Sequence, residues 1–376
     1  MGAEQHVHWR AAVMDLVPRP DRIPAAAANV YDAVVRGGLA DLRPTPRRII
    51  DEAPKRTVYR YLAGEERRQD ALPVLLVPPL AAPSQAFDLR RGCSLAEHLM
   101  GLGHPTYLLE YGDIAFSDRD LGLEHWVTEI IPTAVRRVSE DAGGAPVQLV
   151  GWCLGGIMAL LSVAHEPELP VNSAALIASP FDSRQVRAMS VVRPLDTLTG
   201  GLLGTAIYRV LGGAPAPLVK RAFQLTSLDK YLTRPLAILA HLDDREFLAQ
   251  MEAVDRFTDS MHAYPGRTMG QLYHLFFRVN EIAGGTLTLG RHAVDLSQVR
   301  IPVLSVAGQS DVIAPRSAVH HVEALIPNAP AVRLETGPGG HLGVLAGRSA
   351  RTTTWAWIDE FLAEHAPPHD ALQAAA

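Results

Sequence analysis

Six short apolar runs of four or five residues recur along the 376-residue chain, and turn residues bound each of them. They are rich in β-branched residues and do not alternate with polar ones, which is typical of strands buried on both faces of a parallel sheet. Helical patterns lie between several of the runs, for example over Trp126–Glu140, where Pro132 predicts a kink, and over Ile157–Ala164. This alternation predicts an α/β fold, a mostly parallel sheet flanked by helices. The six runs are Val74–Val77, Thr106–Glu110, Val147–Val150, Ala174–Ala178, Val303–Val306 and Val332–Glu335.

The alternation stops between about Phe181 and Gly285, where helical patterns and loops follow one another. An all-helical insertion between two halves of a sheet indicates a cap over an active site. The alternative is a small second helical domain with no gating role. We therefore expect a helical arm over 1–60, a core over 61–180 and 286–366, a cap or lid over 181–285, and a disordered tail over 367–376.

Composition excludes several classes of protein. The chain has 35 basic and 40 acidic residues and a formal net charge of −5, which argues against broad nucleic-acid binding. Two cysteines, Cys93 and Cys153, are too few for a disulfide scaffold or a cysteine-rich zinc site, and no metal or other cofactor is implied. Neither a signal-peptide core nor an apolar window of about 18 residues occurs, so we expect a cytoplasmic protein without a membrane span.

The strongest motif is Gly151-Trp152-Cys153-Leu154-Gly155-Gly156, which follows the apolar run Val147–Val150 and precedes a helical pattern. A strand, a G-x-C-x-G turn and a helix form a nucleophile elbow, here with Cys in place of Ser. Glycines on either side of the nucleophile let neighbouring backbone approach closely. The helix N-terminus favours a thiolate at Cys153. The alternative for such a turn is a buried, inert cysteine, which is how we interpret Cys93.

An acid and a base follow in the chain order of an α/β-hydrolase triad. Asp311 comes just after the run Val303–Val306, at the edge where parallel sheets bind ligands, and is the candidate acid. Asp182, after an earlier run, is the reserve candidate. His341 lies in a glycine-rich loop after the last run and is the candidate base.

An oxyanion hole needs backbone N–H groups directed at the developing negative charge. The N–H of Leu154, next to the nucleophile, is the first candidate. The second donor is expected from the loop after Val74–Val77. Pro78 and Pro79 cannot donate, so Leu80 or Ala81 is the candidate there.

These residues together resemble the polyhydroxyalkanoate synthase (PhaC-like) branch of the α/β-hydrolases, closest in size to its short, class III type. The resemblance rests on the cysteine box, on Asp311 in its loop and on Gly339-Gly340-His341-Leu342-Gly343. Weaker matches are Pro78-Pro79 followed by Asp88-Leu89, and Gly103-His104. The chain departs from the family pattern around the site, at Ala82-Pro83, Tyr111, Glu124-His125 and Val312.

The resemblance implies an α/β-hydrolase fold and a 3-hydroxyacyl-coenzyme A thioester as substrate, which Cys153 would attack with release of CoA. It also implies a polyester granule as a further partner, and a homodimer or a separate partner subunit. Two alternatives stay open. The same site could hydrolyse acyl-CoA or a polyester, as a thioesterase or esterase, or the protein could be a non-catalytic lipid- or granule-binding protein.

Overall fold

The computed structural model describes residues 20–62, 71–186, 213–225 and 228–366. The expectations for the first 19 residues and for the tail 367–376 lie outside these described residues. No helix among them is long and apolar enough to cross a bilayer.

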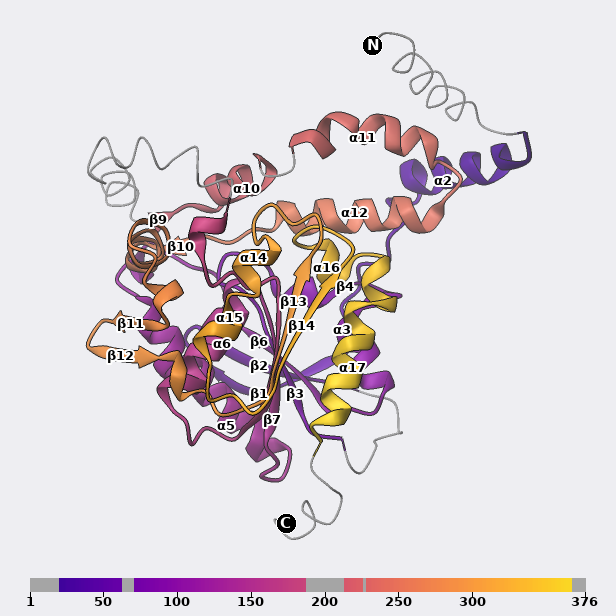
Figure 1. Cartoon of the computed structure of the whole chain (residues 1–376). Helices are drawn as coiled ribbons and strands as arrows, with labels where there is room; N and C mark the ends of the chain where they lie inside the picture. Colours follow the sequence, from indigo (N-terminus) through magenta and orange to yellow (C-terminus); the bar gives the residue numbers. More distant parts are fainter. Residues whose placement is uncertain (1–19, 63–70, 187–212, 226–227, 367–376) are drawn as a thin grey trace, which may run out of the picture.

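An eight-stranded sheet forms the centre of the molecule (Figure 1), in the order β1-β2-β6-β3-β7-β8-β13-β14. All neighbours from β6 to β14 pair in parallel, whereas β2 pairs antiparallel with both β1 and β6. All six predicted runs are strands of this sheet, which confirms the expected α/β fold class. The strands are β1 (Arg47–Ala53), β2 (Arg56–Tyr61), β3 (Val74–Val77), β6 (Thr106–Glu110), β7 (Val147–Trp152), β8 (Val171–Ile177), β13 (Val303–Gly308) and β14 (Val332–Gly337).

Helices cover both faces of the sheet, and each face has its own apolar cluster. The neighbours Leu75 and Leu76 in β3 lie in different clusters, because successive side chains of a strand point to opposite faces. On one face pack α5 (Ile131–Asp141) and α6 (Leu154–His165), and on the other α3 (Leu95–Gly101) and α17 (Thr354–Glu364) (Figure 1). Burial on both faces explains why the central strands are continuous apolar runs. Short helices α14 (Arg316–Val319), α15 (Val322–Leu325) and α16 (Gly343–Ala346) complete the C-terminal half.

The expected helical arm over residues 1–60 was wrong in part. One helix, α2 (Ile23–Val35), is present, but residues 47–61 form β1 and β2 and belong to the sheet. Val58 and Tyr61 face the core, while Arg47 pairs with Glu110 at 3.3 Å and Arg60 with Asp141 at 2.7 Å. Strand β1 is the edge of the sheet and β2 lies next to it; charged side chains are usual at a sheet edge, and here they hide the apolar signal of both strands in the sequence.

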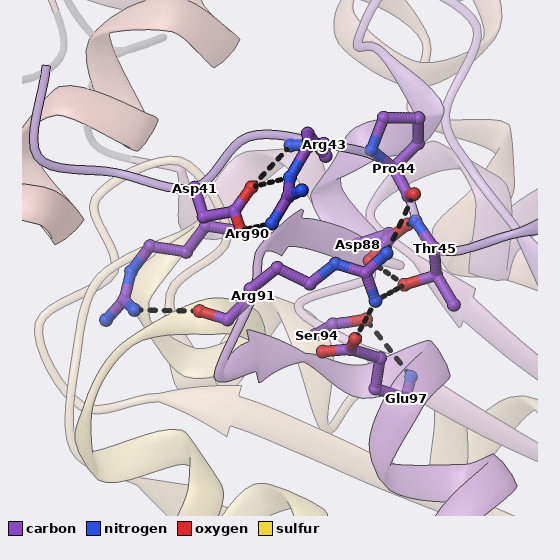
Figure 2. A network of polar contacts seen from close by, with 9 residues as sticks. All are labelled: Asp41, Arg43, Pro44, Thr45, Asp88, Arg90, Arg91, Ser94 and Glu97. Atoms are coloured by element: carbon purple, nitrogen blue, oxygen red, sulfur yellow. Dashed lines mark hydrogen bonds and ion pairs between the residues drawn. The ribbon is translucent and has the colours of Figure 1, made fainter. Parts of the chain in front are cut away.

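A polar network fixes the segment just before β1 (Figure 2). Both oxygens of Asp88, in β4 (Asp88–Arg90), accept hydrogen bonds from Thr45, one from its N–H and one from its hydroxyl, each at 2.8 Å. The Arg91 guanidinium donates to the Pro44 carbonyl at 3.0 Å and pairs with Glu97 at the start of α3. Asp88 therefore holds the N-terminal segment against the core. The partner of β4 is β5 (Cys93–Ser94).

The described part of 181–285 is mostly helical, as expected of the inserted segment. Its longest helix, α12 (Arg245–Asp259), lies over the end of the sheet where β13 and β14 finish (Figure 1). The other helices are α10 (Ala216–Leu225), α11 (Leu228–Ala240), α13 (Gly266–Gln271) and a π-helical stretch, Leu272–Arg278. Two short strands, β9 (Gly213–Ala214) and β10 (Tyr264–Pro265), pair antiparallel. A gating role for this segment stays a prediction.

Two local features differ from what the sequence predicts. The helix expected over 126–140 begins as α4 (Leu123–His125), continues as a π-helical stretch over Trp126–Ile130 and becomes α5 at Ile131. Pro132 lies just after the π-helical stretch, at the start of α5, where it cannot donate the backbone N–H of a regular helix. A hairpin of β11 (Thr286–Leu289) and β12 (His292–Asp295), which the sequence analysis did not predict, follows the inserted segment.

Candidate active site

Cys153 lies at the sharp junction between β7 and α6. Its backbone has φ +53° and ψ −125°, a conformation that residues with a Cβ rarely adopt. The Cys153 N–H donates to the Ile177 carbonyl of β8 at 2.9 Å, which holds the turn against the sheet. The side chain is partly exposed. This is the strained strand–turn–helix geometry of a nucleophile elbow, as the motif predicts.

The glycines on either side of Cys153 are required by close backbone contacts. A Cβ on Gly155 would lie 2.2 Å from the Val77 carbonyl oxygen, and a Cβ on Gly151 would lie 2.4 Å from the Gly156 Cα. The first contact brings the loop after β3 directly against the start of α6. The glycine spacing therefore places the candidate oxyanion loop beside the nucleophile.

Asp311 and His341 meet beyond the ends of β13 and β14. His341 Nδ1 lies 2.8 Å from Asp311 Oδ2, and both side chains are buried. The other carboxylate oxygen, Oδ1, accepts hydrogen bonds from the N–H groups of Ile313 and Ala314 at 2.8 and 2.9 Å. Asp311 is thus held by its own loop and can fix the orientation of the imidazole.

The electrostatics of His341 connect it to Cys153. Burial lowers the pKa of His341, but the charges of Cys153 and Asp311, and hydrogen bonds to both, outweigh burial and raise this pKa from 6.5 to about 10. The site therefore favours the protonated form of His341, whose imidazole lies between Asp311 and Cys153. That arrangement can deliver a nucleophilic sulfur and then protonate a leaving group.

The candidate oxyanion donors surround the same turn. Leu154 is the first residue of α6, and Leu80 and Ala81 are buried in the loop after β3. Within the described part of the chain, none of these three backbone N–H groups has an acceptor. The loop is held by the Tyr111 hydroxyl, which donates to the Pro78 carbonyl at 3.1 Å, and by the His262 N–H, which donates to the Ala81 carbonyl at 2.9 Å.

The reserve acid and the second cysteine lie elsewhere. Asp182 Oδ1 accepts hydrogen bonds from Asn280 Nδ2 and from the Arg184 N–H, each at 2.9 Å, so this carboxylate organises the start of the inserted segment. Cys93 is buried with its Sγ 3.2 Å from the Ala346 carbonyl, and burial raises the pKa of its thiol. Neither takes part in the contacts that join Asp311 to His341.

Two aromatic residues at the site were missed by sequence reasoning. The Trp152 ring packs on His341, with ring centroids 5.2 Å apart. Burial raises the pKa of the Tyr264 phenol in β10. The charge of nearby Cys153 raises this pKa further. Trp152 could have been noticed from its place in the motif. Nothing in the sequence connects Tyr264 with an elbow so far away along the chain.

No group of three or more His, Cys, Asp or Glu side chains in the described ranges is arranged to hold a metal ion.

Comparisons with known proteins point to one family. The chain is 25% identical to the poly(3-hydroxyalkanoate) polymerase subunit PhaC of Allochromatium vinosum over 333 residues, 85% of this chain and 90% of that protein. It is 23% identical to PhaC of Haloferax mediterranei over 372 residues, 96% of this chain and 70% of that protein. PhaC of Synechocystis sp. is 24% identical over 84% of this chain and 85% of its own length. The chain is a PhaC-like α/β-hydrolase.

This PhaC-like chain is accordingly an enzyme, either an acyltransferase or a hydrolase. No protein-family model matches it. Among solved structures it is similar to a monoacylglycerol lipase of Paleococcus ferrophilus, with a TM-score of 0.49 and 16% identity over 78% of this chain and 96% of that one.

Proposed function

We propose that this enzyme is a polyhydroxyalkanoate synthase-like acyltransferase that moves the acyl group of 3-hydroxyacyl-CoA thioesters onto Cys153 and releases CoA. The observation that carries the proposal is the cysteine at the elbow, electrostatically coupled to a His341 that Asp311 holds at 2.8 Å. The similarity to PhaC proteins supports this substrate class. With acyl-CoA as its substrate, the enzyme is proposed to act in the cytoplasm.

Cysteine suits a thioester substrate for a chemical reason. The Cys153 sulfur, its proton held by His341, attacks the acyl carbonyl carbon, and the Leu154 N–H with that of Leu80 or Ala81 stabilises the oxyanion. The C–S bond to CoA breaks, and His341 protonates the departing CoA sulfur. One thioester has then replaced another, so the acyl group on Cys153 stays activated.

The second half of the reaction transfers that acyl group. His341 takes the proton of an incoming 3-hydroxyl, the oxygen attacks the acyl carbon, and the C–S bond to Cys153 breaks, which forms an ester and restores the thiol. The resemblance to the family also suggests a second route, in which Asp311 activates this hydroxyl directly. Its side chain is fully buried with both oxygens hydrogen-bonded, so the geometry favours His341 as the base in both halves.

The test is incubation with 3-hydroxybutyryl-CoA, with free CoA, 3-hydroxybutyrate and polymer measured separately. We expect CoA and polymer, and intact-mass spectrometry should show an acyl adduct that Cys153→Ala abolishes while Cys93→Ala retains it. CoA and free 3-hydroxybutyrate without polymer would instead identify a thioesterase. An unreactive Cys153 and no turnover of any acyl-CoA would favour a non-catalytic lipid- or granule-binding protein. Turnover in Cys153→Ala would contradict the proposed nucleophile.

A further inference from the structure

Trp152, the residue just before the nucleophile, makes two contacts with the candidate base. Its indole Nε1–H donates to the His341 backbone carbonyl at 3.1 Å. Its ring also lies against the imidazole, with centroids 5.2 Å apart and planes inclined by 40°. The first contact fixes the backbone of His341 and the second limits rotation of its side chain.

The opposite constraint comes from Asp311, which holds Nδ1. An imidazole fixed at Nδ1, along one ring surface and at its own backbone has little freedom except at Nε2, the nitrogen left for Cys153. Trp152 is itself almost fully buried, so its indole N–H has no solvent alternative to the His341 carbonyl.

Trp152 is supported from the inserted segment. Phe257 of α12 packs against the indole, with ring centroids 6.0 Å apart. The same helix bonds to the segment after His341, because Gln250 Nε2 donates to the Ala346 carbonyl at 2.7 Å. Arg348 pairs with Asp244, the N-cap of α12, at 2.8 Å, and Arg351 pairs with Glu246. Helix α12 is therefore held against the segment that follows His341, both at its N-terminal end and through Gln250.

We propose that Trp152 is a positioning residue for the base, holding the His341 imidazole toward Cys153 with Phe257 of α12 as its support. This inference rests on the proposed Cys153–His341–Asp311 triad, but it concerns the orientation of His341 and needs no particular acyl substrate. It assigns a role to a position in the cysteine box that touches no reacting atom.

The test uses alkylation of Cys153 by iodoacetamide, followed by mass spectrometry of its peptide from pH 6 to pH 11. This rate depends on the Cys153–His341 pair and requires no acyl-CoA. In Trp152→Phe we expect at least about a tenfold slower rate at pH 7, part of the roughly hundredfold loss that a displaced catalytic group can cause. The change in rate caused by titration of His341 should also move to lower pH, because a displaced imidazole loses the interactions that raise its pKa. With acyl-CoA, kcat should fall while KM stays nearly constant.

The matched control is Trp355→Phe. Trp355 is also buried, and its Nε1–H donates to the Leu345 carbonyl at 2.8 Å, but its ring packs on His98. Both variants lose one indole–carbonyl bond, so both should lower the melting temperature. Only Trp152→Phe should change the alkylation profile.

Should Trp152→Phe fail to fold, Phe257→Leu keeps the indole and removes its support, and it should shift the profile in the same direction by a smaller amount. The inference would be overturned if the alkylation profile of Trp152→Phe, or of Phe257→Leu, matched the profile of Trp355→Phe. If the profile responds as expected while wild-type enzyme turns over no acyl-CoA, the positioning role stands and the proposed function fails.

Discussion

At the scale of single residues, the molecule keeps an unfavourable backbone conformation at its most reactive side chain. Cys153 has φ +53°, whereas glycine adopts such angles without steric cost. A strained non-glycine residue costs of order 1–3 kcal/mol and persists where surrounding structure enforces it. Hydrogen bonding to β8 and the close glycine contacts of the elbow supply that enforcement here.

This strain predicts that loss of function can increase stability. Cys153→Gly should be more stable than Cys153→Ala by about 1 kcal/mol, because both lack the sulfur and only glycine relieves the strain. The free energy of unfolding from urea titrations measures the difference. The control is Ala159→Gly in the middle of α6, where the same Ala-to-Gly change should destabilise by about 1–2 kcal/mol, because it also removes a buried methyl group. Equal stability of the two Cys153 variants would contradict the strain argument.

At the scale of elements, the contact between α6 and the loop after β3 depends on the absence of one Cβ. Alanine at Gly155 would bring a methyl group against backbone atoms of Val77 and Pro78, which cannot move aside like a flexible side chain. The clash must then separate the loop from the helix. Because the candidate oxyanion donors lie on these two elements, their spacing should change with it.

Gly155→Ala is therefore expected to cost about 1–3 kcal/mol of stability and to lower kcat more than it raises KM. Thermal unfolding and steady-state kinetics with the acyl-CoA that proves to be the substrate measure both effects. Gly101→Ala at the end of α3 is the control, since a Cβ there meets nothing within 4 Å. It should leave stability and kcat near wild type. A fully active Gly155→Ala would show that the loop supplies no donor.

Sequence patterns could predict the elements whose burial or close contacts leave a recognisable pattern in neighbouring residues. The central strands were predictable because burial on both faces leaves continuous apolar runs, and the elbow because its contacts demand glycine. The edge strand β1 and its neighbour β2 were not predictable, because they carry arginines and acids that form ion pairs. The packing of Phe257 on Trp152, and of Tyr264 near Cys153, joins residues distant in sequence that no local pattern connects.

At the scale of the whole molecule, the site links stability to pH. The pKa of His341 is about 10 in the folded protein and near 6.5 when unfolded. Below pH 6.5 both states hold the proton, so the stabilisation is complete. Above it only the folded state does, so the stabilising contribution is lost progressively up to about pH 10.

Removing the sulfur should weaken this dependence. In Cys153→Ala, His341 loses the charge and the hydrogen bond of Cys153 but keeps Asp311, so its pKa should be raised less. Urea unfolding at pH 6, 8 and 10 should therefore show a smaller loss of stability with pH in the variant than in wild type. Parallel curves for the two proteins would indicate that Cys153 does not interact with His341 in the folded state.

The order of the three triad residues along the chain has a consequence for synthesis. The elbow in β7 leaves the ribosome well before β13 and β14, which bring Asp311 and His341 into place, and before the α12 contacts that hold the His341 loop. Because synthesis runs from the N-terminus, a nascent chain carries this thiol before the base that activates it has been made. The Cys153 thiol is thus activated only after the segments that carry Asp311 and His341 have been made.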